Sequence, residues 1–171
     1  MITGDLEIRR IASQDWRMLR AIRLEALADS PTAFITTLEE ANGYPDAVWV
    51  DRSTEDPEGG QATFLAVGKD RCRGMVIGLD RSSSGREVVA IVSVYVAPDV
   101  RRSGVGDALM DAVEAWARER GSEVTSLWVV EGNDGARGFY EARGYRATLD
   151  RQKISVPPVR WETRFEFRLN G

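Results

Sequence analysis

Residues 94–110 read VYVAPDVRRSGVGDALM. An apolar run ends at a proline, and two arginines precede Gly104 and Gly106 where a helical pattern begins. The first turn of a helix has backbone N–H groups without internal partners and carries partial positive charge, so it binds anions readily. Glycine lets the backbone approach a phosphate closely, and Arg101 and Arg102 add charge nearby. This stretch therefore predicts a binding turn for a diphosphate between a strand and a helix.

Other interpretations of the glycine pair compete with a diphosphate site. A nucleotide-hydrolase P-loop needs Lys-Ser or Lys-Thr after its last glycine, whereas Asp107 and Ala108 follow Gly106 here. A dinucleotide fingerprint needs a third glycine, where Leu109 stands, and a parallel sheet near the start of a domain. An ordinary strand-to-helix turn that uses glycine for close packing fits the pair equally well. The glycine pair alone therefore leaves a binding turn and a packing turn open.

Length and composition predict one globular domain over residues 1–171. The chain is 43% hydrophobic and 29% charged, which is enough apolar material for a core. Its net charge of −4 comes from 23 basic and 27 acidic residues without a dominant basic stretch, so we expect no nucleic-acid partner. No stretch resembles a signal peptide or a membrane span, so we expect a cytoplasmic protein without a membrane partner.

The cysteine and histidine contents limit the available chemistry. Cys72 is the only cysteine, which excludes an internal disulfide and fits a reducing compartment. The sequence has no histidine, which removes the usual general base, the usual metal ligand and any Ser-His or Cys-His catalysis. A zinc site would need carboxylates and a single cysteine, so we expect no metal.

The hydrophobic pattern predicts a mixed α/β (α+β) domain with a largely antiparallel sheet. Residues 88–96 (VVAIVSVYV) lack clean alternation, as expected of a strand buried on both faces. Further strands are predicted over residues 6–11, 62–68, 72–79, 126–130, 145–149 and 163–169. Helices are predicted from Ser13 or Asp15 to residue 29, after Pro45 through Trp49, and over residues 104–120 and 134–143. Loops are predicted over residues 51–61, 80–87 and 155–162.

Two stretches resemble the motifs of the GNAT acetyltransferases. Residues 94–121 (VYVAPDVRRSGVGDALMDAVEAWARERG) resemble the central acetyl-CoA-binding motif, in which a strand and a proline precede Arg/Gln-x-x-Gly-x-Gly/Ala and a helix. Residues 133–147 (NDGARGFYEARGYRA) resemble the second motif, Asn-x-x-Ala-x-x-Phe-Tyr-x-x-x-Gly-Phe/Tyr. The matching positions of the second motif are Asn133, Ala136, Phe139, Tyr140, Gly144 and Tyr145. The pattern of the remaining elements also resembles the family, from residue 6 to residue 169.

The resemblance implies the GNAT fold, a mixed and mostly antiparallel sheet of six to seven strands with splayed central strands and about four flanking helices. It implies transfer of the acetyl group of acetyl-CoA to a primary amine by direct attack through a tetrahedral intermediate. A small-molecule amine is the expected acceptor. A protein N-terminus or lysine stays open as an alternative, as does a non-catalytic acyl-CoA-binding module. Homodimers are frequent in the family, although no residue here identifies an interface.

The resemblance also assigns residues to acetyl-CoA. Unpaired backbone groups of the strand near Val94 are expected to bind the pantetheine arm, and an N–H there to stabilise the oxyanion. Asn133 is expected on the pantetheine and Phe139 beside the cofactor, although core packing explains Phe139 equally well. The full set of expected cofactor residues is Val94, Tyr95, Val96, Arg101, Arg102, Ser103, Gly104, Val105, Gly106, Asp107, Asn133, Phe139 and Tyr140.

Tyr140 is expected to be the general acid that protonates the departing CoA thiolate. A phenol has a pKa of about 10 and a thiol of about 8.5, so this proton transfer is uphill unless the site assists. The alternative is a core aromatic whose hydroxyl bonds to the backbone.

The general base stays open at the level of sequence. Many family members carry a glutamate at the position of Val92. Glu87, at the beginning of that strand, is one candidate, and Glu39 and Glu40 after the first helix are two others. A solvated surface pair explains Glu39 and Glu40 better, and a water chain to a backbone carbonyl is an equal alternative.

Tryptophans offer walls for an acceptor pocket, because aromatic side chains suit small ligands. Trp49 and Trp161 are the candidates, since they stand in or beside irregular segments. Trp16, Trp116 and Trp128 are expected in the core.

Overall fold

The computed structural model describes residues 6–54, 56, 58–82 and 88–169. Within these residues the strands are β1 (Glu7–Arg10), β2 (Gln61–Val67), β3 (Cys72–Asp80), β4 (Val88–Val96), β5 (Val124–Val130), β6 (Arg146–Ile154) and β7 (Arg160–Arg168). The α-helices are α1 (Trp16–Asp29), α2 (Leu38–Asn42), α3 (Asp46–Ser53), α4 (Val105–Glu119) and α5 (Asp134–Ala142). Short 3-10 turns cover Ser13–Asp15, Pro31–Ala33 and Pro98–Val100.

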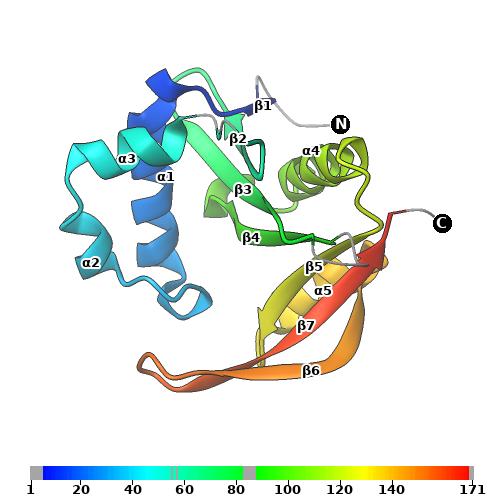
Figure 1. The fold of residues 1–171 in the computed structure, drawn as a ribbon. Helices are drawn as coiled ribbons and strands as arrows, with labels where there is room; N and C mark the ends of the chain where they lie inside the picture. Colours follow the sequence, from blue (N-terminus) through cyan, green and yellow to red (C-terminus); the bar gives the residue numbers. More distant parts are fainter. Residues whose placement is uncertain (1–5, 55, 57, 83–87, 170–171) are drawn as a thin grey trace.

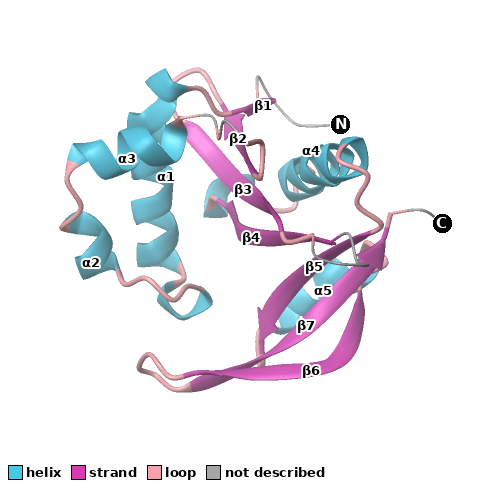
Figure 2. Cartoon of the chain, viewed as in Figure 1, coloured by secondary structure: helices cyan, strands magenta, loops and turns pink. Residues whose placement is uncertain are grey.

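The strands form one sheet in the order β1-β2-β3-β4-β5-β7-β6. All neighbouring pairs are antiparallel except β4 and β5, which are parallel. Helices α1 to α3 lie on one face of β2 to β4, α4 lies on the other, and α5 packs behind β5 and β7 (Figure 1 and Figure 2). The expected mixed, mostly antiparallel sheet is confirmed.

The predicted elements agree with the structure except at α2, at the predicted loop over residues 51–61 and near the C-terminus. Residues 51–53 still belong to α3 and Gln61 already begins β2, so that loop is shorter than predicted. Every expected strand and helix is present, and Asp29 ends α1 before Pro31, as predicted. The short helix α2 was not predicted. The prediction of a loop over residues 155–162 is wrong at its end, because β7 already begins at Arg160 and its alternation extends through Arg168.

Two hydrophobic cores cover the two faces of the sheet. One core fills the space beneath α4 and α5, and the other lies between the sheet and helices α1 to α3. Strand β4 contributes to both, which confirms its predicted burial on two faces. Representative side chains are Val76, Val89, Leu109, Val113 and Phe165 in the first core, and Leu19, Ile22, Trp49, Leu65 and Met75 in the second.

A β-bulge in β4 explains why its sequence does not alternate cleanly. The register against β3 shifts between Met75 and Ile77, so Ser93 and Val94 together oppose a single residue. Ser93 takes up the extra residue with a φ of +55°. As a result, Ile91 before the bulge and Val94 after it both pack on the first core.

Strands β4 and β5 separate after a short paired stretch. Their pairing runs from Val88 opposite Val124 to Ala90 opposite Ser126. Beyond that point the described residues show no pairing between the two strands, while β5 stays paired with β7 as far as Val130. The sheet therefore opens along the C-terminal halves of its two central strands.

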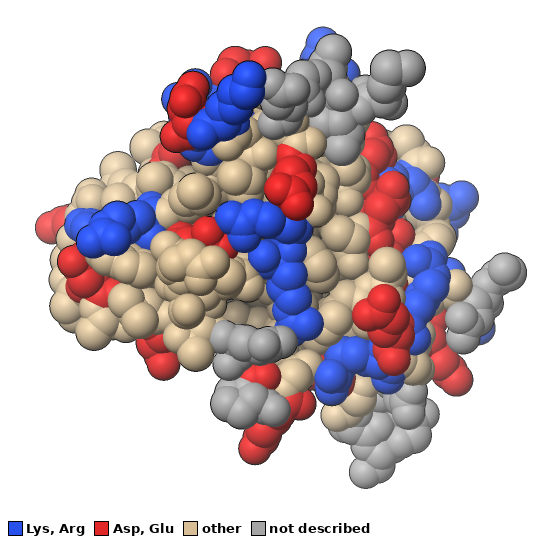
Figure 3. Space-filling model, turned by 90° about the horizontal axis from the view of Figure 1, so that it is seen from above, with Lys and Arg blue, Asp and Glu red and all other residues tan. Residues whose placement is uncertain are grey.

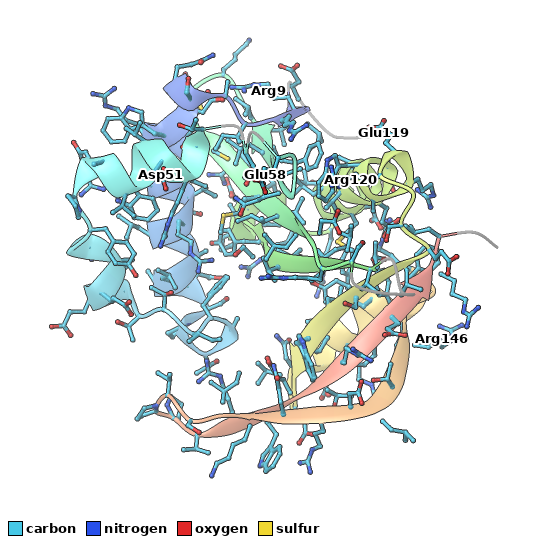
Figure 4. All side chains as sticks on the ribbon, viewed as in Figure 1. Arg9, Asp51, Glu58, Glu119, Arg120 and Arg146 are labelled. Carbon is cyan, nitrogen blue, oxygen red and sulfur yellow. The ribbon has the colours of Figure 1, made fainter. Side chains whose placement is uncertain are left out.

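Helix α4 is fixed to the sheet by close packing and by charge. Ideal Cβ atoms built on Gly74 and Gly78 would lie 2.9 Å from Leu109 Cδ1 and 2.7 Å from Trp116 Cζ3, so only glycine admits the helix at this distance. Arg120, just beyond the helix, donates to Asp80 of β3 at 2.9 and 2.7 Å (Figure 4). These contacts fix the position of the first turn of α4, which belongs to the site described below.

Helix α5 is joined to α4 by a network of charged and polar side chains. Buried Glu114 accepts hydrogen bonds from the Tyr145 hydroxyl at 3.0 Å and from Arg143 Nη2 at 3.1 Å. Arg143 also pairs with Asp107 at 2.8 Å and Asp111 at 2.7 Å, both on α4. The network fixes α5, and with it Tyr140, relative to the first turn of α4.

The packing of α4 predicts opposite effects for two glycine substitutions. Gly78→Ala forces a methyl group against Trp116 and Val113, and we expect the free energy of unfolding to fall by about 1–3 kcal/mol. Gly138→Ala on α5 meets no atom within 4 Å and removes a helical glycine, so we expect a gain of about 0.5–1 kcal/mol. Urea unfolding of the two variants measures both values. Equal stability of the two would contradict the close approach of α4.

Candidate active site

A cavity of about 450 Å³ lies where β4 and β5 separate. Its walls come from α1 and the segment after it, from β4, β5 and α5, and from the β6–β7 hairpin. Among the described residues that line it, Arg23 is the only cation and Glu162 the only carboxylate. The rest of the lining is mainly apolar, with Ser93, Thr36, Asn133, Tyr140 and Gln152 as neutral polar groups.

The bulged part of β4 forms one wall of the cavity. Val92, Ser93 and Val94 all line it, and the described residues give them no partner on β5. A strand without a partner on one side presents backbone N–H and C=O groups that an extended ligand can pair with. Val94 thus stands where the resemblance expects the pantetheine arm and the oxyanion donor.

The turn before α4 presents a group of backbone N–H donors. Arg102 and Gly104 have φ values of +61° and +87°, and the first bond into the helix runs from Ala108 N to Gly104 O at 3.0 Å. The N–H groups of residues 105–107 precede that bond and so have no helical partner. Ser103 Oγ donates to Val100 O at 2.6 Å and closes the turn. Successive N–H groups in such a turn form an anion-binding concavity.

Glycine is needed at the two positions of this turn for different physical reasons. A Cβ on Gly106 would lie 3.3 Å from the ring of Phe139 and 3.7 Å from Val96, so Gly106 allows close packing. A Cβ on Gly104 would meet nothing within 4 Å, and its positive φ is what requires glycine. The packing interpretation therefore describes Gly106 and does not describe Gly104.

Arg101 is tied to the protein itself. It donates to Val96 O at 2.9 Å and forms an ion pair with Asp29 at the end of α1. The hydrogen bond from Arg101 lowers the pKa of the Asp29 carboxyl from its usual value. Arg101 and Arg102 are both exposed at the turn. Of the two predicted cations, Arg101 therefore links α1 to β4 by its ion pair and hydrogen bond.

Tyr95 and Val96 have their side chains away from the cavity. The Tyr95 ring lies in the second core, with its hydroxyl 3.4 Å from Glu25 Oε1. Burial, together with the charges of Asp29 and Glu25, raises the pKa of Tyr95 to about 12. Val96 packs on the first core. Any contact of these two residues with a ligand on the cavity side would have to come from their backbone.

Asn133 lines the cavity and also begins α5. Its Oδ1 accepts a hydrogen bond from Ala136 N at 3.1 Å, which caps the helix. Helix capping is therefore a structural reason for asparagine at this position of the second motif. Asn133 also lies at the wall of the cavity.

Tyr140 is buried on α5 and lines the cavity. Its ring packs against Phe139 and Tyr145, with centroids 5.2 and 5.8 Å apart. Burial raises the pKa of Tyr140 well above its usual value. No described residue forms a hydrogen bond with its hydroxyl, so the expected backbone partner of a purely structural tyrosine is not found among them.

Glu162 is the carboxylate that the sequence did not indicate. It is 8% exposed, stands opposite Val130 of β5, and accepts a hydrogen bond at Oε1 from Gln152 of β6. Its Oε2 has no partner among the described residues. The prediction of a loop over residues 155–162 hid this side chain, although the alternation of RWETRFEFR (residues 160–168) was a usable sign of a strand.

The carboxylates proposed from the sequence do not reach the cavity. Glu39 and Glu40 lie on α2, both exposed, and Glu40 accepts a hydrogen bond from Tyr44 at 2.8 Å. Neither lines the cavity, which agrees with the surface interpretation. Glu87 lies outside the described residues.

Three tryptophan expectations are corrected. Trp49 is fully buried in the second core, because α3 turns that side chain toward α1 instead of the cavity. Trp128 was expected in the core, yet it is 37% exposed and lines the cavity, because β5 has lost β4 as a neighbour there. Trp161 is exposed, with the Arg151 guanidinium 4.4 Å from its ring centroid, and does not line the cavity.

The described part of the chain contains no cluster of three or more Cys, Asp or Glu side chains arranged to hold a metal ion. Its helices are also too short or too polar to cross a membrane. On the face seen from above, acidic and basic side chains lie beside one another (Figure 3).

A model of the acetyltransferase (GNAT) family matches residues 18–145. The chain belongs to this family. The match covers the first motif, the second motif as far as Tyr145, and the whole of β4, α4 and β5, whereas the β6–β7 hairpin of the cavity lies outside it. The family resemblance drawn from residues 94–121 and 133–147 is confirmed.

Curated relatives match a limited part of the chain. It is 40% identical over 60 residues to an uncharacterised N-acetyltransferase of Methanocaldococcus jannaschii, covering 35% of this chain and 26% of that protein. It is 36% identical over 61 residues to an uncharacterised N-acetyltransferase of Archaeoglobus fulgidus, covering 36% and 42%. The chain therefore matches less than half the length of each relative.

Solved GNAT structures share the whole fold. The structure of yncA from Salmonella typhimurium with its cofactor acetyl-CoA has a TM-score of 0.79 at 16% identity, covering 98% of this chain and 95% of that one. The structure of the PaiA N-acetyltransferase of Thermoplasma acidophilum in complex with coenzyme A has a TM-score of 0.74 at 14% sequence identity. The match covers 95% of this chain and 98% of that one. These matches show that the fold of the GNAT family spans nearly all of this chain.

Glycines with positive φ begin and follow α4, and they allow a matched test of the turn. Gly104→Ala and Gly121→Ala both place a Cβ in the left-handed region, so each variant should lose about 1–2 kcal/mol of unfolding free energy. Only Gly104→Ala strains the turn that presents the N–H groups of residues 105–107, so we expect about tenfold weaker binding of acetyl-CoA from this variant alone. Calorimetry measures the affinity, which we expect to be micromolar in the unmodified protein. Absence of acetyl-CoA binding by the unmodified protein, or equal weakening of binding in both variants, would contradict a diphosphate site at this turn.

Proposed function

We propose that the protein transfers the acetyl group of acetyl-CoA to a primary amine of a small molecule. The observation that carries the proposal is the cavity at the separated strands, which brings Val94, Tyr140 and Glu162 to one space. The family supports acetyl-CoA as the acyl donor. A volume of about 450 Å³ falls within the range of small-molecule sites, which supports a small acceptor over a protein segment.

Acetyl-CoA fits the groups that this chain leaves unpaired. The N–H groups of residues 105–107 suit its diphosphate, and exposed Arg102 adds positive charge at the turn. The free edge of β4 near Val94 suits the amide-rich pantetheine arm, which pairs with it as an added strand would. The thioester is the acyl donor that this arm delivers to the cavity.

Backbone N–H of Val94 stabilises the oxygen that becomes negative when the amine attacks the thioester carbonyl. Such a donor is effective when it is fixed before the reaction and shielded from bulk water. The bulge at Ser93 and Val94 is held from below by the first core, so the donor does not need to reorganise. In this mechanism, the β-bulge of β4 serves to hold the oxyanion donor in place.

Glu162 accepts the proton that the attacking amine must lose. An amine is mostly protonated at neutral pH, and only the neutral form attacks a carbonyl. Gln152 holds one carboxylate oxygen of Glu162, and the other has no partner among the described residues. Glu162 thus takes the place of the strand glutamate that many family members carry where Val92 stands, and this weakens the case for a non-catalytic binding module.

Tyr140 assists the departure of the CoA sulfur as the C–S bond breaks. Full proton transfer from a phenol to a thiolate is uphill by about 2 kcal/mol with ordinary pKa values, and burial raises the pKa of Tyr140 further. The neutral phenol is therefore present throughout the neutral range, and it stabilises the thiolate by donating a hydrogen bond. Protonation of the sulfur is completed from Tyr140 or from solvent.

The role of Tyr140 is tested by a thiol-release assay with acetyl-CoA and a panel of amines and peptides. We expect release with small amines, and a fall in kcat of about 10²-fold in Tyr140→Phe, because one hydrogen-bond donor to the leaving group is lost. Tyr44→Phe, which removes an exposed hydroxyl away from the cavity, should leave the rate unchanged. Because the pKa of Tyr140 is raised, the rate should show no alkaline fall caused by it below pH of about 10.

Release without any loss in Tyr140→Phe would reject the assigned acid. Binding of acetyl-CoA without release to any amine would instead favour the binding module, and release to peptides alone would favour a protein acceptor.

The role of Glu162 has a different signature. Glu162→Gln should lower kcat at neutral pH by about 10²–10⁴-fold, because no carboxylate is left in the described cavity lining to take the proton. The loss should shrink as pH rises toward the pKa of the acceptor's ammonium, since the free amine then forms in solution. The rate–pH profile measures this convergence, with Glu39→Gln as the surface control. A loss that is the same at every pH would assign Glu162 to structure.

A further inference from the structure

Arg23 is the one charged residue of the described cavity lining that the proposed acetyl transfer does not use. It lies on α1, is half-buried, and lines the cavity. Its Nη1 donates to Ser93 Oγ at 3.0 Å, and its guanidinium carbon lies 4.5 Å from the centroid of the Phe34 ring. These two contacts fix the guanidinium, and neither supplies a negative charge.

The charge of Arg23 is not compensated within the described protein. No acidic side chain there forms an ion pair with it. Burial is the main cause of a lowered pKa of Arg23, and repulsion from Arg52 adds to the effect, whereas a neighbouring carboxylate would raise it. Arginine nevertheless stays protonated in proteins. An unpaired, partly desolvated cation is costly, so its place in a cavity indicates a ligand that brings the counter-charge.

The position of Arg23 limits where that counter-charge lies. Ser93, its hydrogen-bond partner, directly precedes Val94, and successive Cα atoms are about 3.8 Å apart. An anion on the remaining N–H groups of Arg23 therefore lies beside the part of β4 that holds Val94. Glu162, which takes the proton of the amine in the proposed reaction, lines the same cavity of about 450 Å³. A single small acceptor can therefore place its anion on Arg23 and its amine toward Glu162.

We propose that the acceptor is a small amino acid, whose carboxylate is bound by the Arg23 guanidinium while its amine faces Glu162 and the thioester. This inference rests on the proposed acetyl transfer and names its substrate class. An arginine fork binds a carboxylate through two parallel hydrogen bonds. The amine of a peptide N-terminus has an amide in place of this carboxylate, so it would leave Arg23 unpaired.

The test compares acceptors that differ only in charge. Thiol release from acetyl-CoA is measured with standard amino acids and with their primary amides. We expect kcat/KM to be about 10- to 100-fold higher for the acids, because a hydrogen bond to a charged partner is lost in each amide. Arg23→Gln should remove this preference by lowering kcat/KM for the acids alone, and Arg23→Lys should restore part of it. Arg20→Gln, on the same helix but exposed and paired with Asp46, should keep the full preference.

Binding gives a second readout that does not depend on turnover. N-acetyl amino acids and their amides are titrated into the CoA-saturated protein, and we expect only the carboxylates to bind, and only when Arg23 is present. Unchanged acetyl-CoA affinity of Arg23→Gln shows that the variant is folded.

Several outcomes would overturn the inference. Equal turnover of acids and amides would reject the carboxylate site while leaving acetyl transfer intact. Failure of every carboxylate to bind, in a protein that does bind acetyl-CoA, would reject it as well. Absence of acetyl-CoA binding would instead remove the proposed function on which the inference rests.

Discussion

Strands β4 and β5 share only a short stretch of pairing, and the site of this protein depends on that limit. Backbone groups released by the separation have to be satisfied by something other than the sheet, and an extended ligand can do so. The bulge at Ser93 and Val94 contributes to the separation of the strands, because it bends β4 beyond the point where its pairing with β5 ends. The cavity, its exposed Trp128 and the expected oxyanion donor all follow from this one change in the sheet.

Helix α4 places the second half of the proposed cofactor site at the end of β4. Its first turn can present N–H groups only because Gly104 adopts a positive φ, and it can approach α5 only because Gly106 lacks a Cβ. Glycines on β3 allow the helix to lie directly on the sheet, and the network around Arg143 then fixes α5 against it. Close packing at several points therefore sets the relation between the phosphate end of the site and Tyr140.

The charges of the cavity are sparse, and their scarcity makes them informative. A largely apolar lining gives each charged group more influence than it would have at the surface, since fewer water molecules screen it. Arg23 and Glu162 stand on different walls, and each has a neutral partner, Ser93 or Gln152, that positions it without neutralising it. Such an arrangement suits a ligand that carries both charges itself. In the proposed mechanism, Glu162 supplies the carboxylate that many family members carry at the position of Val92.

The sequence by itself determined the order of the elements, the position of the glycine turn between β4 and α4, and the family. Strand periodicity, helix caps and glycine chemistry are local properties, so the residues that carry them are neighbours in the chain. It did not find the carboxylate of the cavity, and it placed Trp49 at the wrong surface. Arg23 meets Ser93 across 70 positions, and Glu162 reaches the same space from the last strand. Only the tertiary structure brings such residues together, because their meeting depends on strand order and on the opening of the sheet, and no local pattern encodes either.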